Sequence, residues 1–522
     1  MGIAALFKQT AQKLPDKVAI EFEDERVTFR EIDSESNKIA NAFQSIGIAK
    51  GDRVAQYIPN SLELVYSLLG NFKNGSIVVP MNISFKEQEI HHILSDSGAK
   101  AVITDMERLP IVKNVADKLP ELKRIIIVDG KENDMSVNHK MISEHAQKSL
   151  IFETLTFHEL MQNSSNKEPS TIIKDDDYSI IFYTSGTTGK PKGAALTQNN
   201  VASNVKALAQ AWKWTEDDVF LLTLPLYHIH GIGVALCGSL YVGNFTILKK
   251  KFAAEEVLES IQKRKVTLFM GVPTMYFKLL EVEGLEKYDT ASMRLFVSGS
   301  APLSKDLFYK LKKAFGHEVL ERAGMSESMM NFSNPYNGER IPGSVGPCLP
   351  GVKVRIVDKN FNDVPVNTEG EILIKGPNVF NGYWNKSHYN KQVFKDGWFV
   401  TGDVGKIDEK GYVYLIGRSK DVIISGGINI YPREIEDVIE SMPEVKECAV
   451  VGIPDKEFGE SVKAYVVLNS KSKLTEDEVV AYCKERLASF KKPKFVDFLE
   501  QLPKNTMGKM LKEELRKMHK RK

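Results

Sequence analysis

The chain has 522 residues, of which 42% are hydrophobic and 26% charged. This length allows roughly two to four domains, and the apolar fraction is ordinary for a globular protein. Lys and Arg number 70 and Asp and Glu 68, giving a net charge of +2. Such an even balance excludes a dominant electrostatic affinity for nucleic acid.

The cysteines and the apolar runs narrow the class of protein further. The four cysteines form no C-x-x-C pair, so a disulfide framework, a zinc site and an iron–sulfur site are all disfavoured. Reduced thiols indicate a cytoplasmic protein. No run approaches the ~18 apolar residues of a membrane span, and the first 17 residues are typical of a short amphipathic helix rather than of a signal peptide.

In the first half of the chain, short apolar runs alternate with helical patterns. This alternation predicts parallel sheets covered by helices. The stretch from about Val128 to Asp175 is more polar and indicates a variable surface loop. The strands expected before it are 53–59, 76–82, 100–105 and 124–130, with a helix at 61–74.

After Val352 the pattern changes to short strands with close turns, which predicts a β-rich subdomain. After Gly417 helices and strands alternate again on a smaller scale. The fold class is therefore α/β, with a large N-terminal domain of parallel-rich sheets, helices and a β-rich subdomain, followed by a small mobile α+β domain. We place the boundary so that the domains are 1–417 and 418–522. The expected C-terminal elements are helices 432–443 and 476–490 and strands 446–454 and 461–469.

The strongest chemical signal is YTSGTTGKPKG, from Tyr183 to Gly193, between an apolar strand and a helix. Its glycines allow backbone N–H groups to wrap an anion, its hydroxyls donate hydrogen bonds and its lysines neutralise charge. The glycine and lysine spacing does not match a Walker A loop. The segment therefore predicts a phosphate-binding loop suited to a triphosphate.

Together with six further motifs in order, this loop resembles the AMP-forming adenylating superfamily of acyl-CoA synthetases, luciferases and nonribosomal adenylation domains. The resemblance covers essentially the whole chain. It implies that a carboxylic acid reacts with ATP to give an acyl-adenylate, and that coenzyme A then takes the acyl group. The further motifs are PLYHIHG (225–231), SGSAPL (298–303), ERAGMSE (321–327), WFVTGD (398–403), GRSKDVIISGGINIYPREIE (417–436) and PKNTMGK (503–509).

The resemblance also assigns a nucleotide site. In it, Asp403 holds the ribose hydroxyls and Arg418 binds the ribose or a phosphate. The full set of assigned nucleotide-binding residues is Thr184, Ser185, Gly186, Thr187, Thr188, Gly189, Lys190, Lys192, Gly299, Ser300, Ala301, Ala323, Gly324, Asp403 and Arg418.

Other residues receive catalytic or binding roles from the same resemblance. Glu327 is expected to bind Mg²⁺, for which a hard carboxylate oxygen is suited, and Ser326 to reach a phosphate or the substrate carboxylate. Lys509 would bridge carboxylate and α-phosphate during adenylation. The remaining assignments are Tyr227 and His228 at the acyl site and thiol entry, Lys420 at a hinge, and Gly426 and Gly427 beside the pantetheine arm of coenzyme A.

Two positions depart from the family pattern. Ala323 stands where relatives usually carry an aromatic residue that stacks on adenine. Without this stacking contact, the free energy of ATP binding should be less favourable by about 0.5–1.5 kcal/mol beyond the effect of buried area. Ser300 replaces a glycine or alanine, a change that we expect to be tolerated. His230, unlike His228, has no assigned role, and we expect it to be structural.

The acid substrate is harder to predict. The segments MGVPTMY, KGPNVFNGYW and GGINIYPREIE are similar to bacterial fatty acyl-CoA ligases, whereas LERAGMSESMMNFSNPYNGERIPGSVG resembles malonyl-CoA synthetases. We favour a fatty acid or other monocarboxylic acid over a malonate-like dicarboxylic acid, with aryl or other acids as a third option. Arg322 or Arg340 could pair with the second carboxylate of a dicarboxylic acid, but Arg322 could instead form a structural ion pair with Glu321 or Glu327. An adenylating enzyme that loads a carrier protein and a nucleotide-binding scaffold without catalysis are further alternatives, and the sequence leaves a homo-oligomer open.

Overall fold

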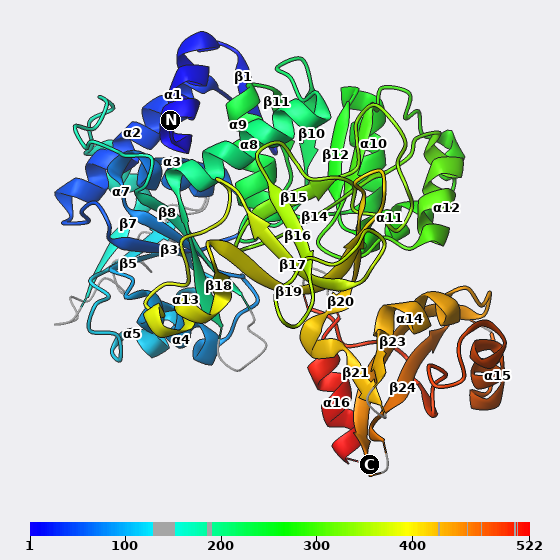
Figure 1. Cartoon of the computed structure of the whole chain (residues 1–522). Coiled ribbons are helices and arrows are strands. Elements are labelled where there is room, and N and C mark those ends of the chain that lie inside the picture. Colours follow the sequence, from blue (N-terminus) through cyan, green and yellow to red (C-terminus); the bar gives the residue numbers. More distant parts are fainter. Residues whose placement is uncertain are drawn as a thin grey trace.

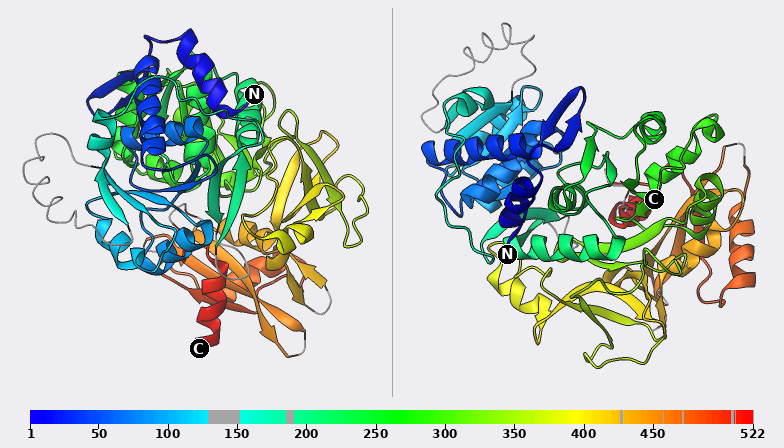
Figure 2. Two further views of the ribbon diagram at one scale, coloured as in Figure 1. Left: turned by 90° about the vertical axis from the view of Figure 1, so that its left-hand side faces the viewer. Right: turned by 90° about the horizontal axis from the view of Figure 1, so that it is seen from above.

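The structure is a computed structural model of the whole chain and describes residues 1–128, 152–184, 191–425, 428–456, 458–470, 472–505, 508 and 510–521. Within these residues the chain forms a large part followed by a small C-terminal part, coloured orange to red in Figure 1. The small part lies at one end of the molecule in the view of Figure 1 and in the left-hand view of Figure 2. The predicted α/β class with a large and a small domain is confirmed.

Two parallel-rich sheets form the centre of the large part. Among the described residues, the first has eight strands in the order β15-β14-β13-β12-β10-β11-β1-β2, antiparallel only at its two edge pairs. The second has seven strands in the order β7-β6-β5-β3-β4-β8-β9, antiparallel only between β8 and β9.

The strands of the first sheet are β1 (Val18–Phe22), β2 (Glu25–Thr28), β10 (Val219–Leu222), β11 (Phe245–Leu248), β12 (Leu268–Gly271), β13 (Leu295–Ser298), β14 (Leu320–Met325) and β15 (Met329–Ser333). Those of the second are β3 (Arg53–Tyr57), β4 (Ile77–Pro80), β5 (Ala101–Asp105), β6 (Arg124–Val128), β7 (Glu153–Thr156), β8 (Tyr178–Thr184) and β9 (Lys192–Thr197).

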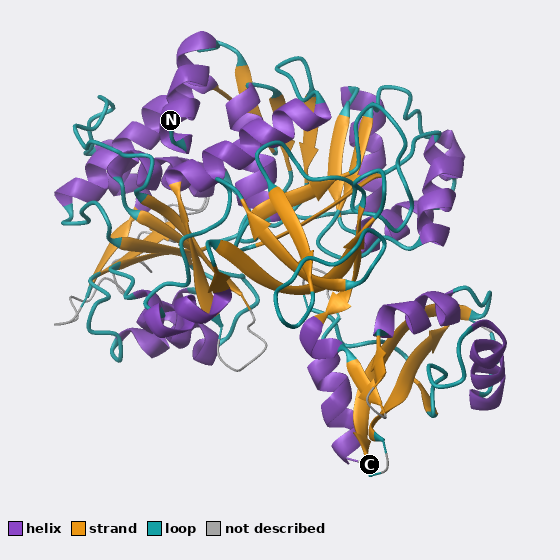
Figure 3. Ribbon diagram, in the orientation of Figure 1, coloured by secondary structure: helices purple, strands orange, loops and turns teal. Residues whose placement is uncertain are grey.

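Helices separate and cover these two sheets (Figure 3). Successive strand residues point to opposite faces of a sheet, and Val54 and Ala55 accordingly belong to different apolar cores. The core that contains Val54 also contains residues of the first sheet, so the helices between the sheets pack against the inner face of each sheet. Helices α4 and α5 cover the outer face of the second sheet, and α10 to α12 cover the outer face of the first.

The helices of the large part are α1 (Ile3–Lys13), α2 (Phe29–Ser45), α3 (Leu62–Asn74), α4 (Glu87–Ser97), α5 (Leu109–Ala116), α7 (Phe157–Gln162), α8 (Gln198–Trp212), α9 (Cys237–Val242), α10 (Ala254–Arg264), α11 (Pro273–Leu280), α12 (Lys305–Phe315) and α13 (Ser387–Val393). Several begin at side-chain caps. Thr28 with Glu31 and Thr197 with Asn200 form reciprocal capping boxes at α2 and α8, which satisfy backbone N–H groups that a helix start leaves unpaired.

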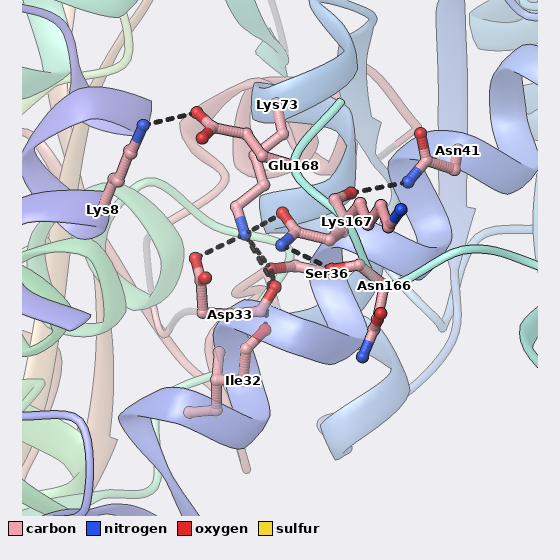
Figure 4. Close-up of polar contacts among 10 residues, drawn as sticks. Lys8, Ile32, Asp33, Ser36, Asn41, Lys73, Asn166, Lys167 and Glu168 are labelled. Atoms are coloured by element: carbon pink, nitrogen blue, oxygen red, sulfur yellow. Dashed lines mark hydrogen bonds and ion pairs between the residues drawn. The ribbon is translucent and has the colours of Figure 1, made fainter. Parts of the chain in front are cut away.

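The segment that leads into β8 is held by polar contacts with α2 (Figure 4). Asn41 donates to the carbonyls of Ser165 and Lys167 at 2.8 Å each. The half-buried Lys73 donates from its ammonium group to four oxygens of Asp33, Ser36 and Asn37 at 2.7–2.8 Å. The chain is therefore fixed before it enters the strand that carries the predicted phosphate loop.

Two antiparallel-rich sheets complete the described structure. The β-rich subdomain consists of β16 (Lys353–Val357), β17 (Gly370–Lys375), β18 (Phe394–Lys395), β19 (Trp398–Ile407) and β20 (Val413–Arg418). The small part consists of β21 (Ile423–Ser425), β22 (Ile428–Ile430), β23 (Val445–Asp455), β24 (Gly459–Leu468), β25 (Phe495–Phe498), α14 (Pro432–Glu440), α15 (Glu476–Arg486) and α16 (Lys512–Arg521).

Among the described residues, no helix is both long and apolar enough to cross a membrane.

Candidate active site

The predicted phosphate loop joins two paired strands. β8 ends at Thr184 and β9 begins at Lys192, and these two residues lie opposite each other in the antiparallel ladder. The six loop residues assigned from the sequence between them, Ser185, Gly186, Thr187, Thr188, Gly189 and Lys190, lie outside the described residues. Because β8 runs parallel to β4, the loop leaves from the carboxyl end of the sheet, where α/β proteins usually bind ligands.

Glu327 lies in the turn between β14 and β15 and is 6% exposed. Its Oε1 accepts a hydrogen bond of 2.7 Å from the hydroxyl of Tyr383, and its backbone carbonyl accepts one of 2.8 Å from the N–H of Phe380. No Lys or Arg of the described residues forms an ion pair with this carboxylate. Ser326, the other assigned residue of this turn, is half-buried beside it.

The Glu327 carboxylate could hold a divalent cation only together with ligands from a bound substrate. Over the described part of the chain, no three His, Cys, Asp or Glu side chains come together as a metal cage. Mg²⁺ does not need such a cage, since it usually takes one or two carboxylates together with the phosphates of a substrate. The hard oxygens of Glu327 suit that arrangement.

Asp403 and Arg418 lie opposite each other on β19 and β20. The Arg418 Nε is 2.8 Å from Asp403 Oδ1, and Arg418 also donates to the carbonyl of Thr401 at 3.1 Å. The charges of Asp403 and then of Glu327 raise the pKa of Arg418. The two assigned nucleotide residues are thus adjacent and held in place by each other.

A second polar cluster is buried behind the turn after β13. Arg322 on β14 is 2% exposed and His230 is fully buried. Arg322 Nη1 reaches only the sulfur of Met330, at 2.9 Å, while its Nε and Nη2 have no hydrogen-bond partner among the described residues. The same is true of His230 Nε2 and of the Ser298 hydroxyl. Burial lowers the pKa of Arg322 to about 9 and also lowers that of His230 well below its usual value.

The alternative interpretation of Arg322, a structural ion pair with Glu321 or Glu327, is not found among the described residues. Successive strand residues face opposite sides, and Glu321 accordingly accepts from the backbone N–H of Leu303 at 3.0 Å. It also lies within electrostatic range of Arg433 in the small part. Glu327, beyond the strand, binds Tyr383 instead. Within the part of the chain that the structure describes, the guanidinium of Arg322 therefore has no carboxylate partner.

Arg340, the alternative candidate for a second carboxylate, is already satisfied. Its guanidinium donates to the carbonyls of Pro335 at 3.2 Å and Tyr336 at 3.1 Å, and also to that of Glu318. These bonds stabilise the turn that contains Pro335 and Tyr336. They distinguish Arg340 from Arg322.

The turn after β13 contains Gly299, Ser300 and Ala301, and Gly299 packs against the guanidinium of Arg322. A Cβ on Gly299 would lie 2.6 Å from the guanidinium carbon, so glycine is required for Arg322 to pack here. Ser300 has a φ of +70°, a left-handed conformation that costs a residue other than glycine about 1–2 kcal/mol. Its hydroxyl lies 3.2 Å from His230 Nδ1. The serine that we expected to be merely tolerated thus joins the buried cluster.

Tyr227 and His228 are half-buried in the loop before a short π-helix, His230–Leu236. The backbone turns so tightly there that a Cβ on Gly231 would lie 2.1 Å from the Pro225 carbonyl oxygen. π-helical turns are frequent at functional sites. The turn places His230 inward, next to Arg322, whose charge helps to lower its pKa.

Ala323 is half-buried and Gly324 exposed, at the end of β14 that leads to Glu327. Gly324 must be glycine, since a Cβ there would lie 1.9 Å from the Met329 carbonyl oxygen. Ala323 pairs with Phe332 across the ladder.

The small part contacts the large part at helix α11. Gly508 lies against Thr274 at the start of α11, and Lys446 lies 5.6 Å from the ring centre of Phe277. Lys509, Gly426 and Gly427 lie outside the described residues. Lys420 is exposed in the turn between β20 and β21, where the next residue, Asp421, is 2.8 Å from Arg516 of α16.

Sequence reasoning assigned no site role to Tyr383, Ser298 and His230. Tyr383 is 56 residues away from Glu327 along the chain, so no local pattern connects them. His230 follows His228 by two residues, and the π-helical turn that buries only one of them has no periodic signal.

Residues 7–384 match the family described as AMP-binding enzyme, and residues 434–509 match the AMP-binding enzyme C-terminal domain. A long-chain-fatty-acid–CoA ligase of Bacillus subtilis is 36% identical over 98% of this chain and 94% of its own length. A malonate–CoA ligase of Arabidopsis thaliana is 32% identical over 96% of this chain and 86% of its own.

The crystal structure of ATP-bound MatB from Rhodopseudomonas palustris superposes with a TM-score of 0.90, at 38% identity over 100% of this chain and 99% of MatB. The apo structure of MatB, at the same identity and coverage, gives a TM-score of 0.79. The arrangement of this chain is therefore closer to the ATP-bound form.

Proposed function

We propose that the acid substrate of this chain is a short dicarboxylic acid of the malonate class. The premise is that the chain belongs to the AMP-binding enzyme family and is an AMP-forming acid–CoA ligase. ATP, coenzyme A and a carboxylic acid are its substrates. The sequence alone favoured fatty acids; the buried cluster around Arg322 now favours the dicarboxylic acid.

The observation that carries this proposal is the unpaired guanidinium of Arg322. A charged group that is buried without a partner costs several kcal/mol, and an apolar acyl chain offers it no acceptor. A carboxylate would accept from Nε and Nη2 together, the bidentate geometry for which arginine is suited. Ser298 and His230 add two further unpaired polar atoms beside it.

The reaction requires a place for each charge that develops. An oxygen of the reacting carboxylate attacks the α-phosphorus of ATP, the bond between the α-phosphorus and the bridging oxygen breaks, and pyrophosphate leaves. We assign the phosphates to the loop from Thr184 to Lys192, the ribose to Asp403 and Arg418, and the α-phosphate and carboxylate to Lys509 and Ser326. Mg²⁺ bound to Glu327 and the phosphates would neutralise charge on the departing pyrophosphate.

In the second half-reaction the thiolate of coenzyme A attacks the acyl carbonyl carbon and AMP leaves. We assign Tyr227 and His228 to the acyl site and thiol entry, Gly426 and Gly427 to the pantetheine path, and Lys420 to a hinge that turns residues 418–522. The higher TM-score with ATP-bound MatB than with its apo form supports a small domain that occupies more than one position.

The second candidate substrate is a fatty acid, which the Bacillus subtilis relative favours. On that alternative the second carboxylate is absent and Arg322 stays unpaired during turnover. We place the enzyme in the cytoplasm, where its four free cysteines would stay reduced.

A substrate panel tests the proposal. The protein is incubated with ATP, Mg²⁺, coenzyme A and malonate, hexanoate or palmitate, and AMP and thioester are measured by mass spectrometry. We expect malonyl-CoA to form fastest. Preference for palmitate or hexanoate would contradict the dicarboxylic substrate, and AMP formation only with a carrier protein would contradict the coenzyme A ligase.

A further inference from the structure

The hydroxyl of Tyr383 is the neighbour that holds the Glu327 side chain. It donates to Oε1 at 2.7 Å, and both groups are largely shielded from solvent. A carboxylate has two oxygens, so this bond engages one and leaves the other for a different partner. Tyr383 itself belongs to none of the motifs that indicated the nucleotide site.

The segment that carries Tyr383, residues 378–386, is fastened to the backbone around Glu327. The N–H of Phe380 donates to the Glu327 carbonyl at 2.8 Å, and the Asn378 side chain donates to the Ser328 carbonyl at 2.5 Å. We call residues 378–386 the Tyr383 segment. Its contacts fix both the main chain and the side chain of Glu327.

The Tyr383 segment is also fastened to β9, the strand that follows the phosphate loop. The Trp384 N–H donates to the Gly193 carbonyl at 2.8 Å, and Tyr383 forms an isolated bridge with Ala194. One stretch of chain thus joins the phosphate-loop hairpin to the Glu327 carboxylate.

The position of the Tyr383 ring is well defined. It packs edge-on against Phe380, with centroids 5.0 Å apart, and lies 5.4 Å from the ring of Tyr389. The Asn390 side chain accepts from the Tyr383 N–H at 2.7 Å and donates to its carbonyl at 2.9 Å. The hydroxyl is therefore presented to Glu327 by a rigid support.

We propose that Tyr383 is a positioning residue that fixes one oxygen of Glu327 and so leaves the other as the ligand of the divalent cation that accompanies ATP. This inference rests on the proposed role of Glu327. Hydrogen-bond partners of metal ligands orient them, and their loss typically weakens metal affinity or activity by about 10- to 100-fold.

The test measures binding rather than turnover. The ATP analogue with a methylene group between the α- and β-phosphates cannot transfer its adenylyl group to an acid. Its dissociation constant is measured by calorimetry in saturating Mg²⁺ and in EDTA. For Tyr383→Phe we expect binding to weaken about 10-fold in Mg²⁺ and less than about 2-fold in EDTA. Tyr389→Phe, which removes a hydroxyl from the adjacent ring, should change neither constant.

Glu327→Gln separates the two claims. If it abolishes the gain in affinity from Mg²⁺, and if Tyr383→Phe has no additional effect in the double variant, both the metal ligand and its positioning are supported. A Glu327→Gln protein that still gains fully from Mg²⁺ would contradict the proposed role of Glu327.

If Glu327→Gln loses the gain but Tyr383→Phe does not, only the Tyr383 inference is overturned. Equal weakening in Mg²⁺ and EDTA would also overturn it, because a general structural defect acts in both conditions. Melting curves check folding, and Tyr383→Leu provides the same comparison if the Phe variant does not fold.

Discussion

The region proposed to bind the nucleotide and the region proposed to bind the acyl group bury charged side chains in opposite ways. Glu327 and Asp403 each have a donor from a neighbouring side chain, Tyr383 in one case and Arg418 in the other. Arg322 and His230 are buried more deeply, yet they retain polar atoms without partners among the described residues. A buried charged group that has a partner can contribute to stability, whereas a buried cation without one destabilises the fold. Such a cation supports the proposal of a negatively charged ligand.

Replacing Arg322 with Met gives the largest expected effect. The loss of two charge-assisted hydrogen bonds, each worth about 1.5–3 kcal/mol, should lower kcat/KM for malonate at least about 100-fold. The melting temperature should rise, because an apolar side chain of similar length replaces a buried unpaired charge. Steady-state kinetics and calorimetry measure the two effects. Arg340→Met is the control; it should leave malonate kinetics unchanged and lower the melting temperature.

Asp403→Asn should behave in the opposite way with respect to stability. It breaks the pair with Arg418 and should lower the melting temperature, while the KM for ATP rises about 10-fold or more through loss of the ribose contacts. A rise in melting temperature for Asp403→Asn, or a fall for Arg322→Met, would contradict the comparison between the two regions.

Ala323→Tyr restores the aromatic residue that the family pattern carries. A stacking contact worth about 0.5–1.5 kcal/mol should lower the KM for ATP about 2- to 12-fold. The KM for the acid should not change. ATP titrations at saturating acid and coenzyme A measure it, and an unchanged KM for ATP would show that adenine does not stack at this position.

A further expected effect concerns how the stability contributed by His230 depends on pH. Burial lowers the pKa of His230 below its usual value, whereas in the unfolded chain it is about 6.5. The unfolded state therefore binds the extra proton, and the stability contributed by neutral His230 is present above pH ~6.5 and lost as the pH falls, by at most ~1.4 kcal/mol per pH unit.

Melting temperatures of the wild type and His230→Gln between pH 8 and pH 5 test this sign. The wild type should lose stability relative to His230→Gln as the pH falls. A difference that is constant with pH would mean that His230 is not held neutral by burial.

Much of the scaffold could be predicted from the sequence because it follows local periodicity. The helix expected at 61–74 is found at Leu62–Asn74, and the strand expected at 100–105 at Ala101–Asp105. The helix expected at 476–490 ends earlier, at Arg486, because Leu487 takes an extended conformation.

The side-chain environments of the site could not be predicted in the same way. Strand alternation implies that Glu321 and Arg322 face opposite sides of the sheet. Only the three-dimensional packing shows that Arg322 lies against Gly299 and meets no carboxylate of the described residues. Likewise, the contact of Tyr383 with Glu327 depends on where a distant segment crosses the sheet. The motifs indicated the reaction, whereas the proposal of a dicarboxylic acid rests on three-dimensional contacts of Arg322 that no motif shows.

The most direct test of a dicarboxylic substrate compares malonate with its monomethyl ester, which keeps the chain length and removes one charge. We expect wild-type kcat/KM for malonate to exceed that for the ester by at least about 100-fold, and this ratio to fall towards one in Arg322→Met. Equal values of kcat/KM for the two acids in the wild type would contradict the account.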